Sequence, residues 1–153
     1  MHYAIISDTH GWLSEELLKQ LQGADVIVHA GDICSPSDYR TLLNIAPVHL
    51  CLGNNDWDNY GPRVQKQVHF ESEGFRWQLC HYEYRLDLDS CDIAVCGHTH
   101  RPFIERDQAT GTLLINPGSP TWPRNGFPSM VRLTITHGKI TEARIIKLSK
   151  EDS

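Results

Sequence analysis

The first half of the chain repeats one pattern, in which a short apolar run ends in polar side chains and a helical segment follows. The apolar runs cover residues 2–6, 26–28 and 48–52. Such runs predict buried β-strands, and strands that alternate with helices predict an α/β sheet with its functional site along one edge. Polar loop composition would explain each loop singly, but not why metal-competent side chains recur after the strands. These side chains are Asp8, His10, Asp32 and Asn54.

Two amphipathic segments separate these runs. Residues 13–21 carry apolar side chains at helical spacing, and Ser14 and two acidic residues open the segment, which is typical of a capped helix. Ser35 and Pro36 open the second segment, which we expect to extend to Ile45. Pro36 would lie in the first helical turn, where its missing N–H is harmless.

From Pro62 onward the pattern changes to that of β-hairpins. Residues 84–88 fit either one helical turn or an irregular link. We expect an α/β fold in which two mixed β-sheets face each other and are flanked by helices, an αββα sandwich formed by residues 1–153 as a single domain. The expected strands of this half cover residues 67–70, 75–80, 93–96, 103–106, 112–115, 130–136 and 140–148.

Two histidines one residue apart, His98 and His100, follow the apolar run at 93–96. We expect Gly97 to give the backbone a conformation there that a side chain would forbid. Imidazole is the commonest metal ligand among side chains, so the pair is a candidate half-site. Taken alone, the motif also fits two ordinary loop histidines.

Composition narrows the class of protein. A chain of 153 residues with 40% hydrophobic content can bury one ordinary core. Its net charge of -5 gives no general attraction for a polyanion, so we expect no stable nucleic-acid partner. We expect no signal peptide and no membrane span, and the five unpatterned cysteines favour reduced thiols in a cytoplasmic protein. The sequence leaves the oligomeric state open, a homo-oligomer included.

Seven nitrogen and oxygen donors follow predicted strands, which is too many for one ion. They fit two divalent ions that share one carboxylate and lie ~3.5–4 Å apart. The absence of a thiolate favours manganese, which we expect, or iron, nickel or zinc, over a structural zinc site. The donors are Asp8, His10, Asp32, Asn54, His81, His98 and His100.

The order of these motifs resembles that of the calcineurin-like metallophosphoesterase superfamily, and in particular its small single-domain phosphodiesterases from bacteria and archaea. A further segment, residues 115–119 with Pro123 and Arg124, resembles a signature of the same branch. The motifs that carry the resemblance are Ser7-Asp8-Thr9-His10-Gly11, Gly31-Asp32, Gly53-Asn54-Asn55-Asp56, His81 and Gly97-His98-Thr99-His100.

The resemblance implies a dinuclear metal-dependent phosphodiesterase that acts on a small phosphorylated metabolite or nucleotide. Asp32 would bridge the two ions. Water activated by both ions would attack phosphorus in line. One ion would be held by Asp8, His10, Asp32 and His100, and the other by Asp32, Asn54, His81 and His98.

Two positions depart from the superfamily pattern. Many members have a histidine acid after the ligating asparagine, whereas this chain has Asn55, and an amide cannot supply a proton at pH 7. The replacement of that histidine by Asn55 weakens a monoesterase interpretation more than a diesterase one. We take Asn55 and Asp56 as candidate catalytic residues. Tyr82 follows His81, where glycine is usual.

Other polar and aromatic side chains have structural explanations that compete with a role in the site. Strand histidines usually pack in the core or on a sheet, tryptophans that could line a cleft usually pack, and Asn-Pro-Gly-Ser segments form turns. The residues concerned are His29, His49, His69, Trp57, Trp77, Trp122, Asn116, Ser119 and Arg124.

A different class of function uses the same fold without catalysis. A retromer subunit resembles this fold and serves as a scaffold, so the alternative is a non-catalytic metal-binding interaction module. A metal store or sensor would bind ions without turnover. The complete ligand set favours the enzyme, because a scaffold has no physical need for it.

Overall fold

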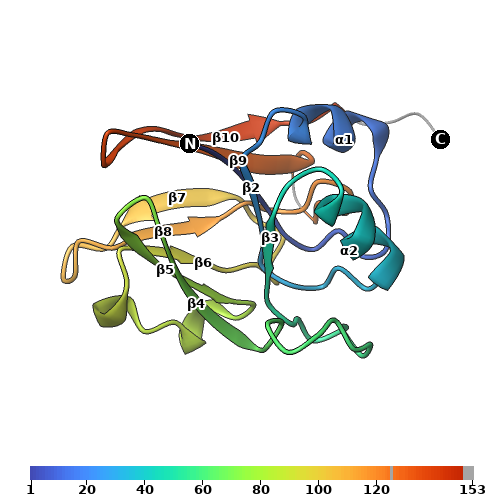
Figure 1. Cartoon of the computed structure of the whole chain (residues 1–153), viewed down its shortest axis with the longest axis horizontal. Coiled ribbons are helices and arrows are strands. Elements are labelled where there is room, and N and C mark those ends of the chain that lie inside the picture. The colour runs from blue at the N-terminus through green and yellow to red at the C-terminus, as the bar shows by residue number, and fades with distance from the viewer. Residues whose placement is uncertain (125, 150–153) are drawn as a thin grey trace.

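Two five-stranded β-sheets face each other in the computed structural model, which describes residues 1–124 and 126–149. The first sheet has the order β10-β9-β1-β2-β3, and the second has the order β4-β5-β6-β8-β7 (Figure 1). The strands are β1 His2–Ile6, β2 Val26–His29, β3 Val48–Leu50, β4 Gln67–Ser72, β5 Phe75–Cys80, β6 Ile93–Val95, β7 Phe103–Arg106, β8 Leu113–Asn116, β9 Ser129–Thr136 and β10 Lys139–Lys147.

Each sheet contains three adjacent parallel strands. In the first sheet β1, β2 and β3 are parallel, and β9 joins β1 in an antiparallel pair. In the second, β5, β6 and β8 are parallel, and the hairpin partners β4 and β7 lie at its edges. The expected fold class of two facing mixed sheets is confirmed, and the carboxyl ends of parallel strands meet at a common edge within each sheet.

Alternate side chains of both sheets form the core between them. Trp77 is 1% exposed, and its ring centroid lies 4.7 Å from that of Tyr3 on the opposite sheet. Because strand side chains alternate, strands of the first sheet present a second apolar set on their outer face. The buried residues between the sheets include Tyr3, Ile5, Val28, Trp77, Leu79, Ile93, Val95 and Val131.

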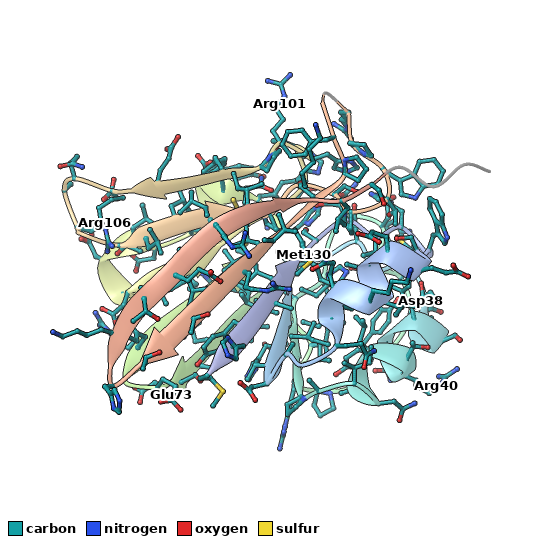
Figure 2. The ribbon with its side chains drawn as sticks, turned by 90° about the horizontal axis from the view of Figure 1, so that it is seen from above. Asp38, Arg40, Glu73, Arg101, Arg106 and Met130 are labelled. Carbon is teal, nitrogen blue, oxygen red and sulfur yellow. The ribbon has the colours of Figure 1, made fainter. Side chains whose placement is uncertain are left out.

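Both α-helices cover the outer face of the first sheet. Helix α1 spans Glu15–Leu21 and α2 spans Pro36–Leu43, and Figure 1 shows both on the side away from β4–β8. Leu17, Leu21 and Leu42 pack against Ile6 and Ile27 of the sheet. Figure 2 shows Met130 of β9 beside α1, and Arg40 extending from the outer side of α2.

The outer face of the second sheet is covered differently. Residues 83–90 contain two 3₁₀ helices, η1 Glu83–Arg85 and η2 Leu88–Ser90, where the sequence left one turn or a link open. The Gln78 side chain on β5 donates to the Asp87 carbonyl at 2.9 Å and to Ser90 Oγ at 3.1 Å, so these turns are fastened to the sheet. Within the described residues, α-helices therefore flank only one of the sheets.

Element boundaries differ from the expected ones where long-range contacts decide them. Strand β3 ends at Leu50 rather than at residue 52, because the Leu52 N–H turns to the Gln65 carbonyl at 2.8 Å. The β4–β5 hairpin is longer than expected, and only Glu73 and Gly74 form its turn, both with positive φ. Helix α2 ends at Leu43 instead of Ile45.

None of the described helices has the length and apolarity needed to cross a bilayer.

Candidate metal centre

All seven expected ligands lie at one edge of the molecule, just after β1, β2, β3, β5 and β6. In Figure 2, Arg101, which directly follows His100, extends from one end of the molecule, whereas Glu73 of the β4–β5 turn lies at the opposite end. The two sheets therefore contribute their strand ends to a common site.

The Asp8 carboxylate is at the centre of the cluster. Its Oδ1 lies 3.3 Å from His100 Nε2, 3.7 Å from His81 Nε2 and 3.8 Å from His10 Nε2. Its Oδ2 accepts hydrogen bonds from Ser7 Oγ at 2.6 Å and from the His98 N–H at 3.0 Å. One oxygen is thus fixed by the protein, while the other points at three imidazoles.

Asp32 lies on the other side of the same imidazoles. Its Oδ2 is 3.4 Å from His81 Nε2 and 3.7 Å from His10 Nε2. Burial alone raises the pKa of Asp32, but the adjacent His81 imidazole and the hydrogen bonds from Asn55 outweigh burial and lower this pKa to about 2. The carboxylate is therefore ionised at neutral pH, as a metal ligand must be.

Asn54 and His98 complete the ligand set. Asn54 Oδ1 lies 3.3 Å from His98 Nδ1, and both side chains are less buried than Asp8 and Asp32. Asp8 also reaches His81, which the resemblance placed with the other ion. The ligands of the two expected ions consequently form one continuous cluster.

Backbone carbonyls set the tautomer of two imidazoles. His81 Nδ1–H donates to the Ala30 carbonyl at 2.8 Å, and His100 Nδ1–H donates to the Trp122 carbonyl at 2.5 Å. A carbonyl only accepts, so each Nε2 keeps its lone pair for a cation. Burial lowers the pKa of both histidines, but the neighbouring carboxylates of Asp32 and Asp8 respectively, together with the bonded carbonyls, outweigh it, so both pKa values are raised.

Two buried atoms of the cluster have no hydrogen-bond partner. They are Asp8 Oδ1 and His81 Nε2, 3.7 Å apart. Leaving such groups unpaired is costly, and a cation between them would satisfy both. The ligating atoms of Asp8, His10 and His100, and those of Asp8, Asp32 and His81, each lie within 4.8 Å of one another. The side chains present therefore fit a divalent metal.

The backbone at the cluster adopts an uncommon conformation. Five expected ligands have left-handed φ values, a region that non-glycine residues rarely occupy. Such a conformation persists only where the surrounding structure enforces it. The values are 57° at Asp8, 49° at His10, 60° at Asp32, 70° at His98 and 61° at His100.

The expected reason for Gly97 is wrong. Its φ is not in the left-handed region, so any residue could adopt its backbone conformation. Space is the actual reason, because a Cβ there would lie 2.1 Å from Ser7 Oγ and 2.6 Å from Asp8 Oδ2. Gly53 is required in the same way, since its Cβ would lie 2.2 Å from Asp32 Oδ1.

The two candidate catalytic residues, Asn55 and Asp56, both contact the Asp32 loop. Asn55 donates its backbone N–H to Asp32 Oδ1 at 2.8 Å and its amide to Oδ2 at 3.2 Å. Asp56 accepts from the backbone N–H groups of Asp32 at 2.7 Å, Gly53 at 2.8 Å and Cys34 at 2.8 Å. Both carboxylate oxygens of Asp56 therefore accept backbone N–H groups. Asp56 is a positioning residue that holds the loop around Asp32.

His29 is buried, as expected, but it also joins two loops of the centre. Its Nδ1 accepts the Gly31 N–H at 3.1 Å, and its Nε2–H donates to Thr9 Oγ1 at 3.0 Å. Thr9, which follows Asp8, and Gly31, which precedes Asp32, are thus linked through one imidazole. The sequence signal was available, since His29 ends the strand that leads to Asp32.

The Asn-Pro-Gly-Ser segment supports the metal loops rather than forming only a turn. The Asn116 amide donates to the Gly97 carbonyl and to Thr99 Oγ1, both at 3.2 Å. Ser119 Oγ donates to the Asp8 carbonyl at 2.8 Å. Arg124 is exposed.

Comparison with known proteins agrees with this geometry. The sequence profile of the calcineurin-like phosphoesterase superfamily domain matches residues 1–138. A probable metallophosphoesterase of Methanothermobacter thermautotrophicus is 35% identical, with 96% of this chain and 92% of that protein aligned.

Solved structures share the fold. An archaeal phosphodiesterase superposes with a TM-score of 0.75 at 23% identity, covering 97% of this chain and 100% of that one. Vps29 of Entamoeba histolytica, solved with Zn²⁺, superposes with a TM-score of 0.74 at 20% identity, covering 96% and 98%. The profile match and the archaeal relative establish that the chain belongs to the calcineurin-like phosphoesterase superfamily.

Proposed function

We propose that the protein is a phosphodiesterase that works with two divalent ions. The observation that carries the proposal is the pair of buried, unpartnered atoms, Asp8 Oδ1 and His81 Nε2, at the centre of seven donors from both sheets. The archaeal phosphodiesterase with the same fold supports a diester substrate. The substrate would be a small phosphoester rather than a nucleic acid, and the protein would act in the cytoplasm.

The two ions would share Asp32, as the resemblance implied. When bound, they would activate water for attack on phosphorus and offset charge on the phosphate oxygens. One would be held by Asp8, His10, Asp32 and His100, and the other by Asp32, Asn54, His81 and His98.

The residues of the chain itself would hold this geometry. Asn55 fixes the Asp32 carboxylate through two hydrogen bonds, and Asp56 fixes the backbone of the same loop. Asn55 cannot protonate a leaving oxygen. Diesters with a weakly basic leaving group would therefore be the best substrates.

The donor set is rich in imidazole, which suits iron, nickel or zinc better than magnesium or calcium, and its carboxylate and amide oxygens also suit manganese. We propose manganese. Zinc is the main alternative, because Vps29 of Entamoeba histolytica was solved in complex with Zn²⁺.

A non-catalytic scaffold is the second candidate, because the Vps29 structures share this fold. Binding of metal without turnover would support that candidate. The distinguishing observation is the complete set of seven ligands.

The test is hydrolysis of bis(4-nitrophenyl) phosphate by protein loaded with Mn²⁺ or Zn²⁺, with and without EDTA. We expect turnover that EDTA abolishes. Asp32→Asn should lower kcat by roughly 10²-fold or more and reduce the number of bound ions, because one carboxylate balances two cations. The matched control is Asp89→Asn, since Asp89 is exposed on η2. Normal turnover with two ions in Asp32→Asn would exclude the dinuclear model.

A further inference from the structure

A cavity of about 280 Å³ opens beside two of the expected ligands, Asn54 and His81. Its volume lies just below the ~300–1,000 Å³ that is typical of pockets for a whole small-molecule ligand. It can therefore accept one substituent of a phosphodiester while the phosphate lies at the ions. The side chains that give the cavity its chemistry are Trp57, Lys66, Tyr82 and Arg85.

Trp57 offers this cavity a large aromatic surface. The side chain is 86% exposed, although an indole usually buries most of its area. It directly follows Asp56, whose three backbone hydrogen bonds fasten the loop beside the metal centre. Trp57 thus projects from an anchored segment, and its exposed ring can stack on a planar group of the substrate.

Tyr82 contributes a second ring to the cavity. Its centroid lies 4.7 Å from that of His98 and 5.4 Å from that of His81. The Arg85 guanidinium lies 5.5 Å from the Tyr82 centroid, a cation–π contact that holds both side chains. Tyr82 replaces the glycine usual in the superfamily, so this wall is a property of the chain's own sequence.

The charges in the cavity favour an anion. Lys66 and Arg85 are cationic, and the carboxylate of Asp56 already accepts three backbone N–H groups. A substituent with its own negative charge would gain from both cations. Rings and cations together fit a planar heterocycle that carries an additional phosphate.

We propose that this cavity binds a nucleotide-type arm of the substrate, consisting of a nucleobase and a second phosphate beyond the one that is hydrolysed. The proposal rests on the phosphodiesterase function proposed above and names its substrate class. The base stacks on Trp57, Tyr82 lines the cavity beside it, and Lys66 and Arg85 bind the second phosphate.

Three diesters with the same 4-nitrophenolate leaving group test the proposal. Their second arm is methyl, thymidine 5′, or thymidine 5′ with a 3′-phosphate. Because the leaving group is constant, differences in kcat/KM measure how much the second arm contributes to binding and turnover. Base stacking predicts that the thymidine ester exceeds the methyl ester roughly tenfold. The 3′-phosphate should add a further twofold to fivefold, about the value of exposed charge pairs.

Variants assign these preferences to residues. Trp57→Ala should reduce the thymidine-to-methyl ratio to near one, and the double change Lys66→Ala with Arg85→Ala should remove the gain from the 3′-phosphate. Trp12→Ala is the matched control, because Trp12 is an exposed tryptophan outside this cavity. Equal kcat/KM for all three esters in the parent protein, or an unchanged ratio in Trp57→Ala, would overturn the proposal.

A binding measurement separates this proposal from the enzymatic one. Calorimetric titration of the metal-loaded protein with thymidine 3′,5′-bisphosphate requires no turnover. We expect Kd to rise roughly tenfold in Trp57→Ala and to stay constant in Trp12→Ala. If no ester is hydrolysed but this difference is found, the phosphodiesterase proposal fails and the nucleotide site stands. Equal Kd in the parent and Trp57→Ala proteins would remove the site, whether or not esters are hydrolysed.

Discussion

Several side chains of the candidate metal centre are held in place through hydrogen bonds made by the atoms that point away from the centre. His81 and His100 each donate Nδ1–H to a carbonyl, and one oxygen of Asp8 accepts two hydrogen bonds. Geometry of this kind reduces the reorganisation that metal binding requires. The consequences can be tested one residue at a time.

His29 should make the protein sensitive to acid. Burial lowers the pKa of His29 to about 4, although Asp56 and Asp8 partly oppose the shift. Because the folded-state pKa lies below the ordinary value of 6.5, the stabilisation is complete above pH 6.5 and is lost as the pH falls toward 4. The loss should amount to about 3 kcal/mol. Urea unfolding in EDTA at several pH values measures it.

His29→Gln should lose less stability than the parent protein over this pH range, because glutamine does not titrate. His69→Gln provides the control, since His69 is exposed on β4. A parallel pH dependence in the parent and His29→Gln proteins would show that other groups cause the acid sensitivity.

Asn55 should make the rate depend steeply on the leaving group. A general acid contributes ~10²–10⁴ in rate, most of all for basic leaving oxygens, and Asn55 supplies none. Aryl diesters should therefore be cleaved readily and alkyl diesters slowly. The measurement is kcat/KM against leaving-group pKa for a series of substituted esters.

Asn55→His tests the same position. Asp56 is committed to three backbone N–H groups, so it is not free to orient a new imidazole. The variant also loses the amide bond to Asp32. We expect a lower kcat and little change of slope. Alkyl esters cleaved as fast as aryl esters by the parent protein would mean that another group supplies the proton.

Among the secondary-structure elements, the helices depend on their serine caps. Ser14 Oγ accepts the Leu17 N–H at 3.2 Å, and Ser35 Oγ accepts the Asp38 N–H at 3.1 Å. Ser14→Ala and Ser35→Ala should each lower the free energy of unfolding by about 1 kcal/mol. Urea titration measures the change, with the exposed Ser37→Ala as control. If Ser14→Ala and Ser35→Ala lower the free energy of unfolding no more than Ser37→Ala does, packing alone stabilises these short helices.

The sequence predicted those features of the elements that local signals determine. Both caps, the alternating strands and the hairpin of the last two expected strands, residues 130–136 and 140–148, depend on residues a few positions apart, and they were confirmed. Gly97 was misinterpreted because its constraint comes from Ser7, on a distant segment. The bonds of Asp56 to the Asp32 loop depend likewise on the packing of β2 beside β3, which no local pattern shows.

Across the whole molecule, the centre connects the two sheets. Asp8 and Asp32 follow strands of the first sheet, and His81, His98 and His100 follow strands of the second. A ligand that binds only the folded state stabilises it, by about 2.7 kcal/mol at one hundred times Kd. Mn²⁺ or Zn²⁺ should therefore raise Tm by about 5–10 °C relative to EDTA.

Thermal unfolding monitored by circular dichroism checks this effect. Mg²⁺ at the same concentration should raise Tm less, because it prefers oxygen ligands and keeps its water. Asp8→Asn should abolish most of the shift. A Tm that does not change with Mn²⁺ or Zn²⁺ would contradict the assignment of the cluster as a metal centre.

The left-handed backbone at five expected ligands has a consequence for how this centre can change. Each such residue costs roughly 1–3 kcal/mol, and glycine would relieve most of that cost. At these positions, a glycine variant should be more stable than the matching alanine variant, although both lack the ligand. Once a ligand is lost at one of these positions, selection for folding would therefore favour glycine over other residues without a ligating group. The ligands thus occupy places where the backbone conformation itself does not favour the residue that the chemistry requires.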